Sequence, residues 1–107
     1  MKEKGLIEDP QQEALTILSE ECAELIVACS KAQRFGLMSD GDGKFPHTNL
    51  ETLVNEMGDV LALCDVVCRK FGITTLSVEA SKQQKLDKLR IYSHLMDEQE
   101  IITLLNS

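Results

Sequence analysis

The chain has 107 residues, of which 43% are hydrophobic and 27% charged, and its formal net charge is -7 at pH 7. This length and composition are typical of a globular protein, so we expect one domain over residues 1–107. The acidic balance argues against nucleic acid as a partner, because a phosphate backbone attracts clustered Lys and Arg. It does not exclude a small phosphorylated ligand, since a divalent cation can bridge carboxylates and phosphates.

Nothing in the sequence indicates a membrane protein. No apolar run approaches the ~18 residues that suggest a membrane span. Residues 1–10 carry charges but no apolar stretch of signal-peptide length. We therefore expect a cytoplasmic protein without a membrane partner.

The first predicted helix begins at Pro10, with Asp9 as its N-cap. Apolar residues then recur every three or four positions, which is the spacing of one helical face. These residues are Leu15, Leu18, Cys22, Leu25 and Cys29. Gly36 is a stop signal, which gives a helix of about 26 residues or ~40 Å.

A loop rich in Gly and Asp follows over residues 36–49. Thr48 and Glu51 have the spacing of a capping box, in which each side chain bonds to the backbone N–H of the other residue. They open a second helix, and Gly72 ends it.

The rest of the chain predicts two more helices. Thr74 or Thr75 can cap a third helix that runs to about Tyr92. The segment from Asp97 to Leu105 has its own capping-box spacing and an apolar face. No segment alternates as a strand would, so the predicted fold class is an all-α bundle.

The second helix is apolar around nearly its whole circumference, which is the pattern of a buried helix. Glu56 projects into this apolar surface and Asp59 lies beside it, so we expect both carboxylates to be at least partly withdrawn from water. A buried charge without a partner is unfavourable, and such groups are paired, protonated or metal-bound. The nearest basic residues along the chain, Arg69 and Lys70, are more than two turns away.

If the two long helices pack antiparallel, Glu21 and Glu24 of the first can meet Glu56 and Asp59 of the second. Oxygen-only ligands of this kind select a hard cation, Mg²⁺ or alternatively Mn²⁺. In the other interpretation, the acids of the first helix are solvated, while Glu56 and Asp59 pair with Lys or Arg of the third helix. Residue types alone leave both interpretations open.

The four cysteines lie in two pairs, each on one helical face. They are Cys22 and Cys29 on the first helix, and Cys64 and Cys68 on the second. We interpret them as small buried apolar residues, because free cysteine is often buried. The alternative is a zinc site formed by all four, although the sequence has no closely spaced C-x-x-C pair.

Glu21 and Glu24, three residues apart, and Glu56 and Asp59, also three apart, resemble the carboxylate motifs of the MazG-like all-α nucleoside triphosphate pyrophosphohydrolases. This group also includes dimeric dUTPases and phosphoribosyl-ATP pyrophosphohydrolases, and small phage-type members look most similar. The resemblance covers most of the chain, from about residue 15 to residue 90. The loop between the motifs is slightly longer than is usual in the group.

The resemblance implies Mg²⁺-dependent hydrolysis of (deoxy)nucleoside triphosphates to the monophosphate and pyrophosphate. The four motif carboxylates would hold the metal, and Glu20 or Glu21 would orient the attacking water. Lys31 lies two turns beyond the first motif on the same face, so it could neutralise phosphate charge. Lys82 and Lys85 resemble basic positions that follow the second motif in the group, although both could equally be part of a solvated basic face.

Few side chains are suited to recognising a base. The aromatic residues that could stack on one are Phe35, Phe45, Phe71 and Tyr92. In the loop between the motifs, His47 could contact a base or a phosphate, although a single loop histidine is more often solvent-exposed.

Members of the group work as dimers or tetramers in which helices of two subunits pair. The apolar circumference of the second helix is consistent with this, so we expect a homodimer or homotetramer that completes the bundle. The rival from a different class is a non-catalytic helical interaction or regulatory module of the same fold. The motif carboxylates argue against it, because a module freed from catalysis has no physical reason to keep buried acids.

Overall fold

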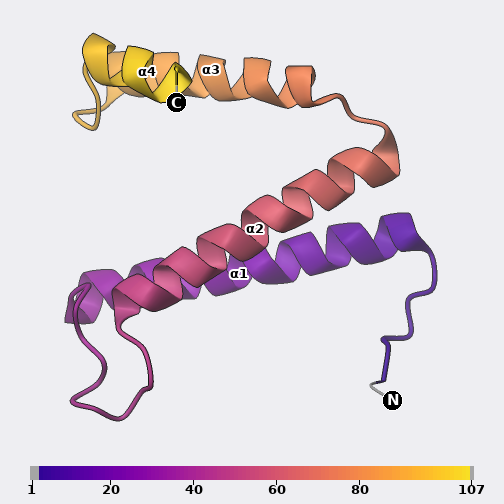
Figure 1. The fold of residues 1–107 in the computed structure, drawn as a ribbon, viewed down its shortest axis with the longest axis horizontal. Helices are drawn as coiled ribbons and strands as arrows, with labels where there is room; N and C mark the ends of the chain where they lie inside the picture. Colours follow the sequence, from indigo (N-terminus) through magenta and orange to yellow (C-terminus); the bar gives the residue numbers. More distant parts are fainter. Residues whose placement is uncertain (1–2, 107) are drawn as a thin grey trace. The chain divides into compact units, whose positions relative to one another are not determined.

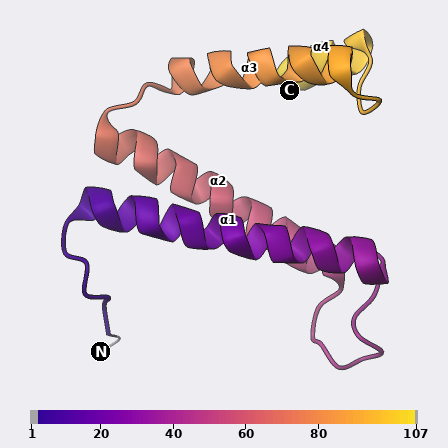
Figure 2. The ribbon, with the colours of Figure 1, turned by 180° about the vertical axis from the view of Figure 1, so that it is seen from behind.

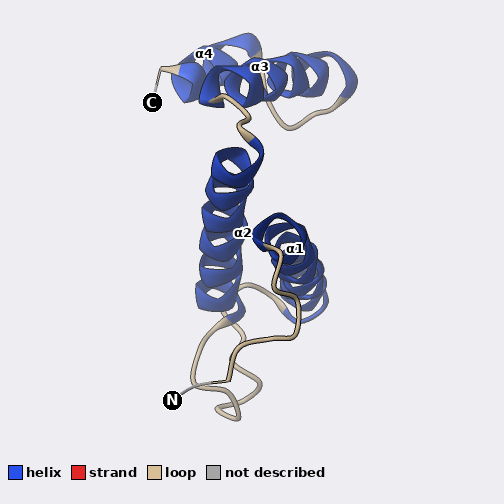
Figure 3. Ribbon diagram, turned by 90° about the vertical axis from the view of Figure 1, so that its right-hand side faces the viewer, coloured by secondary structure: helices blue, strands red, loops and turns tan. Residues whose placement is uncertain are grey.

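The computed structural model describes residues 3–106 of the chain. These residues form helices and loops without any strand (Figure 3), so the predicted all-α class is confirmed. The helices are α1 (Pro10–Phe35), α2 (Asn49–Phe71), α3 (Thr75–Tyr92) and α4 (Glu98–Leu105). The helices group into two compact units, Met1–Gly72 and Ile73–Ser107, and each unit is described separately. One domain over residues 1–107 stays a prediction.

Helix α1 begins and ends at the predicted signals. The Asp9 carboxylate accepts a hydrogen bond of 3.0 Å from the backbone N–H of Gln11, and Pro10 occupies the first turn, where no backbone donor is needed. At the other end, the N–H of Gly36 donates to the carbonyl of Ala32. The helix therefore has 26 residues, the length that the sequence predicts.

Helix α2 starts with the predicted capping box. The N–H of Glu51 donates to the Thr48 hydroxyl over 3.2 Å, and the Glu51 carboxylate accepts from the N–H of Thr48 over 3.0 Å. These bonds hold the pKa of Glu51 below its ordinary value. Gly72 ends the helix in the left-handed conformation (φ 67°), which a residue without a Cβ adopts at little cost.

The first unit is an antiparallel pair of α1 and α2, which lie side by side along most of their length (Figures 1 and 2). Two side-chain bonds join the helices at opposite ends. The Gln11 amide donates to the carbonyl of Lys70 over 2.9 Å, and the Asn49 amide donates to the carbonyl of Lys31 over 3.3 Å. On α1, Ala14 and Ala28 are each only 4% exposed. Small side chains at these points let the helices approach closely.

The expectation that α2 is buried is wrong for this chain by itself. None of the residues of α2 is fully buried, because α1 covers only one of its sides. The side away from α1 exposes a row of apolar residues spaced by three or four positions: Leu50, Val54, Met57 and Leu61. None of the helices within residues 3–106 combines the length and the apolarity needed to cross a membrane.

The second unit consists of α3 and α4. The Thr74 hydroxyl caps α3 by accepting from the N–H of Ser77, and the Asp97 carboxylate caps α4 by accepting from the N–H of Glu100 over 2.8 Å. The Asp97 cap was predicted from the sequence, and Thr74 is the one of the two predicted candidates, Thr74 and Thr75, that caps α3. The unit has a small core in which each helix buries one large apolar residue, Leu86 on α3 and Ile101 on α4.

The capping box of α2 gives a test of the fold. Thr48→Ala should reduce the free energy of unfolding by about 1 kcal/mol, because one N–H of the first turn loses its acceptor. Urea unfolding followed by circular dichroism measures this loss. Thr16→Ala is the matched control, since Thr16 is exposed in the interior of α1, where alanine favours the helix slightly. An equal loss in both variants would contradict the assigned cap.

Candidate functional site

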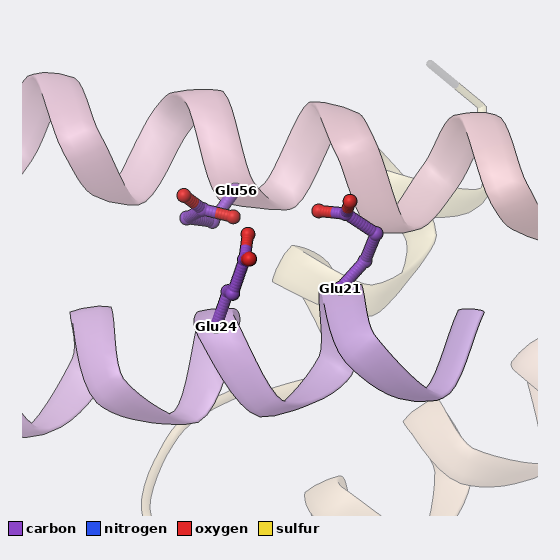
Figure 4. Close-up of side chains that lie close together, drawn as sticks. All are labelled: Glu21, Glu24 and Glu56. Carbon is purple, nitrogen blue, oxygen red and sulfur yellow. The ribbon is translucent and has the colours of Figure 1, made fainter. Parts of the chain in front are cut away.

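Three carboxylates meet between the paired helices. Glu21 and Glu24 extend from α1 toward α2, and Glu56 extends from α2 toward α1 (Figure 4). One oxygen of each side chain lies within 4.8 Å of the corresponding oxygens of the other two. We call these three residues the carboxylate cluster. All three were predicted from their spacing and from the antiparallel packing of the two helices.

The helix register determines which acids meet. With the Asn49 amide on the carbonyl of Lys31, moving two turns forward on α2 and two turns back on α1 brings Glu56 level with Glu24. The same register brings the next turn of α2 level with Glu21. The cluster therefore depends on how the two helices are aligned, and the bonds at both ends of the pair fix this alignment.

The cluster withdraws two carboxylate oxygens from water without giving them a partner. The Oε2 atoms of Glu21 and Glu56 are inaccessible to solvent and accept no hydrogen bond, although both residues are only half-buried as a whole. Loss of hydration disfavours the ionised form and is the largest cause of a raised pKa at both residues. Repulsion from Glu24 raises both pKa values further.

Asp59, the fourth predicted ligand, lies beside the cluster. Its charge contributes to the raised pKa values of Glu21 and Glu56, so it is close to both. Its carboxylate is not among the three that gather within 4.8 Å. The expectation of partial burial is confirmed for Glu56 and wrong for Asp59, which is exposed.

No lysine or arginine within residues 3–72 forms an ion pair with the cluster; the ion pair in this part of the chain joins His47 and Glu51. Acids that crowd together destabilise the folded state unless protons or cations compensate their charge. Three carboxylates at this spacing could hold a divalent cation through oxygen ligands alone.

A cavity of about 340 Å³ opens beside the cluster and includes two of its members, Glu24 and Glu56. Lys31 lines the same cavity, so the structure places this predicted phosphate-binding residue on the same side of α1 as Glu24. Thr52 also lines it and was not predicted. The available signal was its position four residues before Glu56, which puts both on one face of α2.

The remaining predicted site residues lie elsewhere. Glu20 is exposed on α1 next to Glu21, and it is not part of the cluster. Lys82 and Lys85 are exposed on α3, in the second unit.

The structure does not bear out the interpretation of the cysteines as buried apolar residues. Cys22 and Cys29 are exposed, and Cys64 and Cys68 are half-buried, because a pair of helices leaves part of each apolar face open. Within residues 3–106, the group of side chains close enough to share a metal contains no cysteine, so the zinc alternative finds no support. Partial burial raises the pKa of the Cys64 thiol, which makes it less reactive.

Comparisons of the chain with protein-family models, with curated proteins and with solved structures found no match. The resemblance to the MazG-like group therefore depends on the motif residues alone.

The raised pKa values predict how stability depends on pH without metal. Protonated Glu21 and Glu56 stabilise the folded state fully below about pH 4.5, and this contribution is lost as the pH rises through their raised folded-state values. Glu56→Gln imitates the protonated form, so in EDTA the variant should melt at a higher temperature than the wild type at pH 7.

The gain in melting temperature should shrink toward pH 4, where wild-type Glu56 is itself protonated. Thermal melts across this pH range test the prediction. Glu20→Gln removes the same charge from an exposed position on α1 and corrects for the change in net charge. A loss of stability in Glu56→Gln at pH 7, or an equal gain in Glu20→Gln, would contradict the assigned environment of Glu56.

Proposed function

We propose that the protein is a Mg²⁺-dependent nucleoside triphosphate pyrophosphohydrolase, which converts a (deoxy)nucleoside triphosphate into the monophosphate and pyrophosphate. The observation that carries this proposal is the pair of solvent-inaccessible carboxylate oxygens, Oε2 of Glu21 and Oε2 of Glu56, which lack any hydrogen-bond partner. Their positions coincide with the motif residues that resemble those of the MazG-like group. Positive charge would stabilise a site built from these residues, and a Mg²⁺ ion that bridges the carboxylates and the nucleotide phosphates would supply it.

The side chains present fit a hard cation. Glu21, Glu24 and Glu56 would hold it, with Asp59 as a further ligand, and all of these donors are oxygens, which Mg²⁺ prefers and Mn²⁺ accepts. When bound, the metal would neutralise phosphate charge and lower the pKa of an attacking water. This explains how a chain with a net charge of -7 can bind a polyanion.

Hydrolysis requires a water to be oriented and deprotonated. The water oxygen forms a bond to the α-phosphorus, the bond from that phosphorus to the bridging oxygen breaks, and pyrophosphate leaves. Glu21 is the better placed of the two predicted bases, because its carboxylate belongs to the cluster. Glu20 is exposed outside the cluster and would act only through a further water.

Binding of the phosphates requires cations of the chain itself. Lys31 lines the cavity beside Glu24 and Glu56, where its ammonium group can neutralise phosphate charge. Lys82 and Lys85 belong to the second unit, and their assignment to phosphate binding rests on the resemblance alone.

Pyrophosphate release is the direct test of this function. The wild type should release pyrophosphate from at least one nucleotide in a panel of NTPs, dNTPs and dUTP with Mg²⁺, and release should stop in EDTA. Glu56→Gln should reduce kcat at least about 100-fold, because a ligand at the reacting centre is lost.

Glu20→Gln is the matched control, and it should retain more activity than Glu56→Gln. If no nucleotide is hydrolysed and Mg²⁺ does not raise the melting temperature, the enzyme proposal is wrong. The alternative is then a non-catalytic helical interaction module, which the exposed apolar row on α2 favours.

We further propose that two copies of the chain pair through the exposed row of α2, which consists of Leu50, Val54, Met57 and Leu61. The row follows the spacing of a helix-pairing seam and lies on the side of α2 away from the carboxylate cluster. Leu61 is 65% exposed and Val54 is 58% exposed in the single chain, which is unfavourable for large apolar side chains unless a partner covers them.

Sedimentation equilibrium should therefore give a mass of at least two chains of 11.9 kDa, and Leu61→Arg should shift the protein toward the monomer. The control is Leu6→Arg, because Leu6 is 97% exposed before α1 and should leave the mass unchanged. A monomeric wild type at high micromolar concentration would refute the pairing.

A further inference from the structure

Three adjoining cavities connect the carboxylate cluster with the loop between α1 and α2. The first, beside the cluster, is lined by Glu24, Glu56, Lys31 and Thr52 among others. A second, of about 510 Å³, lies against the loop; we call it the loop pocket, and its lining includes Lys31, Phe35, Ser39, Lys44, Phe45 and Asn49. The third, of about 200 Å³, shares Lys31 with both, Thr52 with the first, and Phe45 and Asn49 with the loop pocket. Lys31 therefore stands between the cluster and the loop.

Backbone bonds hold the loop in one shape. The N–H of Asn49 donates to the carbonyl of Ser39 over 2.9 Å, and the N–H of Leu50 donates to the carbonyl of Leu37 over 2.8 Å, so the two ends of the loop are tied together. The Asn49 side chain adds a bond of 2.9 Å to the carbonyl of Gly36. A loop tied at its base can present side chains to a ligand with little further loss of entropy.

Phe45 is the side chain that this loop presents. Its N–H donates to the carbonyl of Asp40 over 3.0 Å, and its ring packs against Gly41, where an added Cβ would lie 2.5 Å from the ring. The ring is still 59% exposed. The Nζ atom of Lys31 lies 6.0 Å from the ring centroid. An aromatic surface and a cation therefore stand next to each other.

The chemistry of the proposed reaction places the nucleoside beside this pair. Hydrolysis between the α- and β-phosphates means that the sugar is attached to the phosphate at the reacting centre. The nucleoside must therefore lie in a space next to the cavity that Glu24 and Glu56 line. The loop pocket is such a space, because Lys31 lines both cavities. Its volume of about 510 Å³ is within the range typical of small-molecule sites.

We propose that the loop pocket binds the nucleoside part of the substrate, with the base stacked on the ring of Phe45 and Lys31 placed between the base and the phosphates. This inference rests on the proposed function, because it assigns a second part of the same substrate to a second cavity. Any base can stack on an aromatic ring, so Phe45 would contribute to the affinity for the nucleoside and not to specificity for one base.

The test compares a ligand that has a base with one that lacks it. Calorimetric titration with Mg²⁺ gives the Kd of non-hydrolysable α,β-methylene nucleoside triphosphates carrying each of the common bases, and the Kd of inorganic tripolyphosphate. The wild type should bind the best nucleotide analogue more tightly than tripolyphosphate. In Phe45→Ala the Kd of that analogue should rise about 10- to 100-fold, while the Kd of tripolyphosphate should not change.

Two further variants separate stacking from damage to the loop. Phe45→Tyr keeps the ring and should retain the affinity of the wild type. Phe71→Ala removes the same side chain from the far end of α2, where it is 40% exposed, and should leave both Kd values unchanged. An equal loss of both ligands in Phe45→Ala would show that the ring only supports the loop and would overturn the proposal.

The proposal is also overturned if the wild type binds tripolyphosphate as tightly as every nucleotide analogue, or if Phe45→Ala binds the best analogue as tightly as the wild type. Binding decides the role of the loop pocket, whereas pyrophosphate release decides the reaction. Release that persists with an unchanged KM in Phe45→Ala would refute the loop pocket alone. Absence of release from every nucleotide would refute the enzyme, and the titrations would still show whether the pocket takes a nucleoside.

Discussion

The antiparallel pairing of α1 and α2 is the contact on which the rest of the first unit depends. The Gln11 amide at one end and the Asn49 amide at the other hold the two helices in a single register. A shift of one residue would turn Glu56 by about 100° away from Glu24 and disperse the cluster. The same shift would break the hydrogen bond between the Asn49 amide and the carbonyl of Lys31, and this bond joins the end of the loop to α1. The carboxylates, the cavity beside them and the loop pocket are therefore consequences of one alignment.

This alignment stabilises the helix pair and at the same time concentrates negative charge within it. Ala14 and Ala28 are buried in the contact and allow close approach, and close approach is what removes water from the inner oxygens of Glu21 and Glu56. The raised pKa values are the electrostatic result of that loss of hydration. Crowded carboxylates repel one another unless protons or cations compensate their charge. Under the proposed function, binding of Mg²⁺ would therefore be linked to the stability of the fold through the same three side chains.

Local signals in the sequence were enough to predict the helices, because Asp9, Thr48, Thr74 and Asp97 each cap the residues that follow them. The meeting of Glu21, Glu24 and Glu56 could also be predicted, since it needs only helical spacing and an antiparallel partner. Burial could not be predicted, because it depends on what packs against a helix rather than on the helix itself. For this reason Asp59 and Cys22 are exposed, although the apolar residues near them in the sequence predicted that they would be at least partly buried. The place of Phe45 beside Lys31 depends on bonds across the loop, and no periodic pattern reports them.

The apolar residues of α2 lie partly against α1 and partly in the exposed row. The helix is apolar almost all round, yet none of its residues is fully buried within the chain. One side meets α1 and carries Glu56 and Thr52 toward the cavity. The exposed row of Leu50, Val54, Met57 and Leu61 lines none of the cavities of the site, and under the proposed pairing a second copy of the chain would cover it. Because none of these four residues lines the cavity or the loop pocket, pairing of two chains through the exposed row would use no residue of either. Assembly could thus supply the stability that a two-helix unit lacks without engaging the residues that line the site.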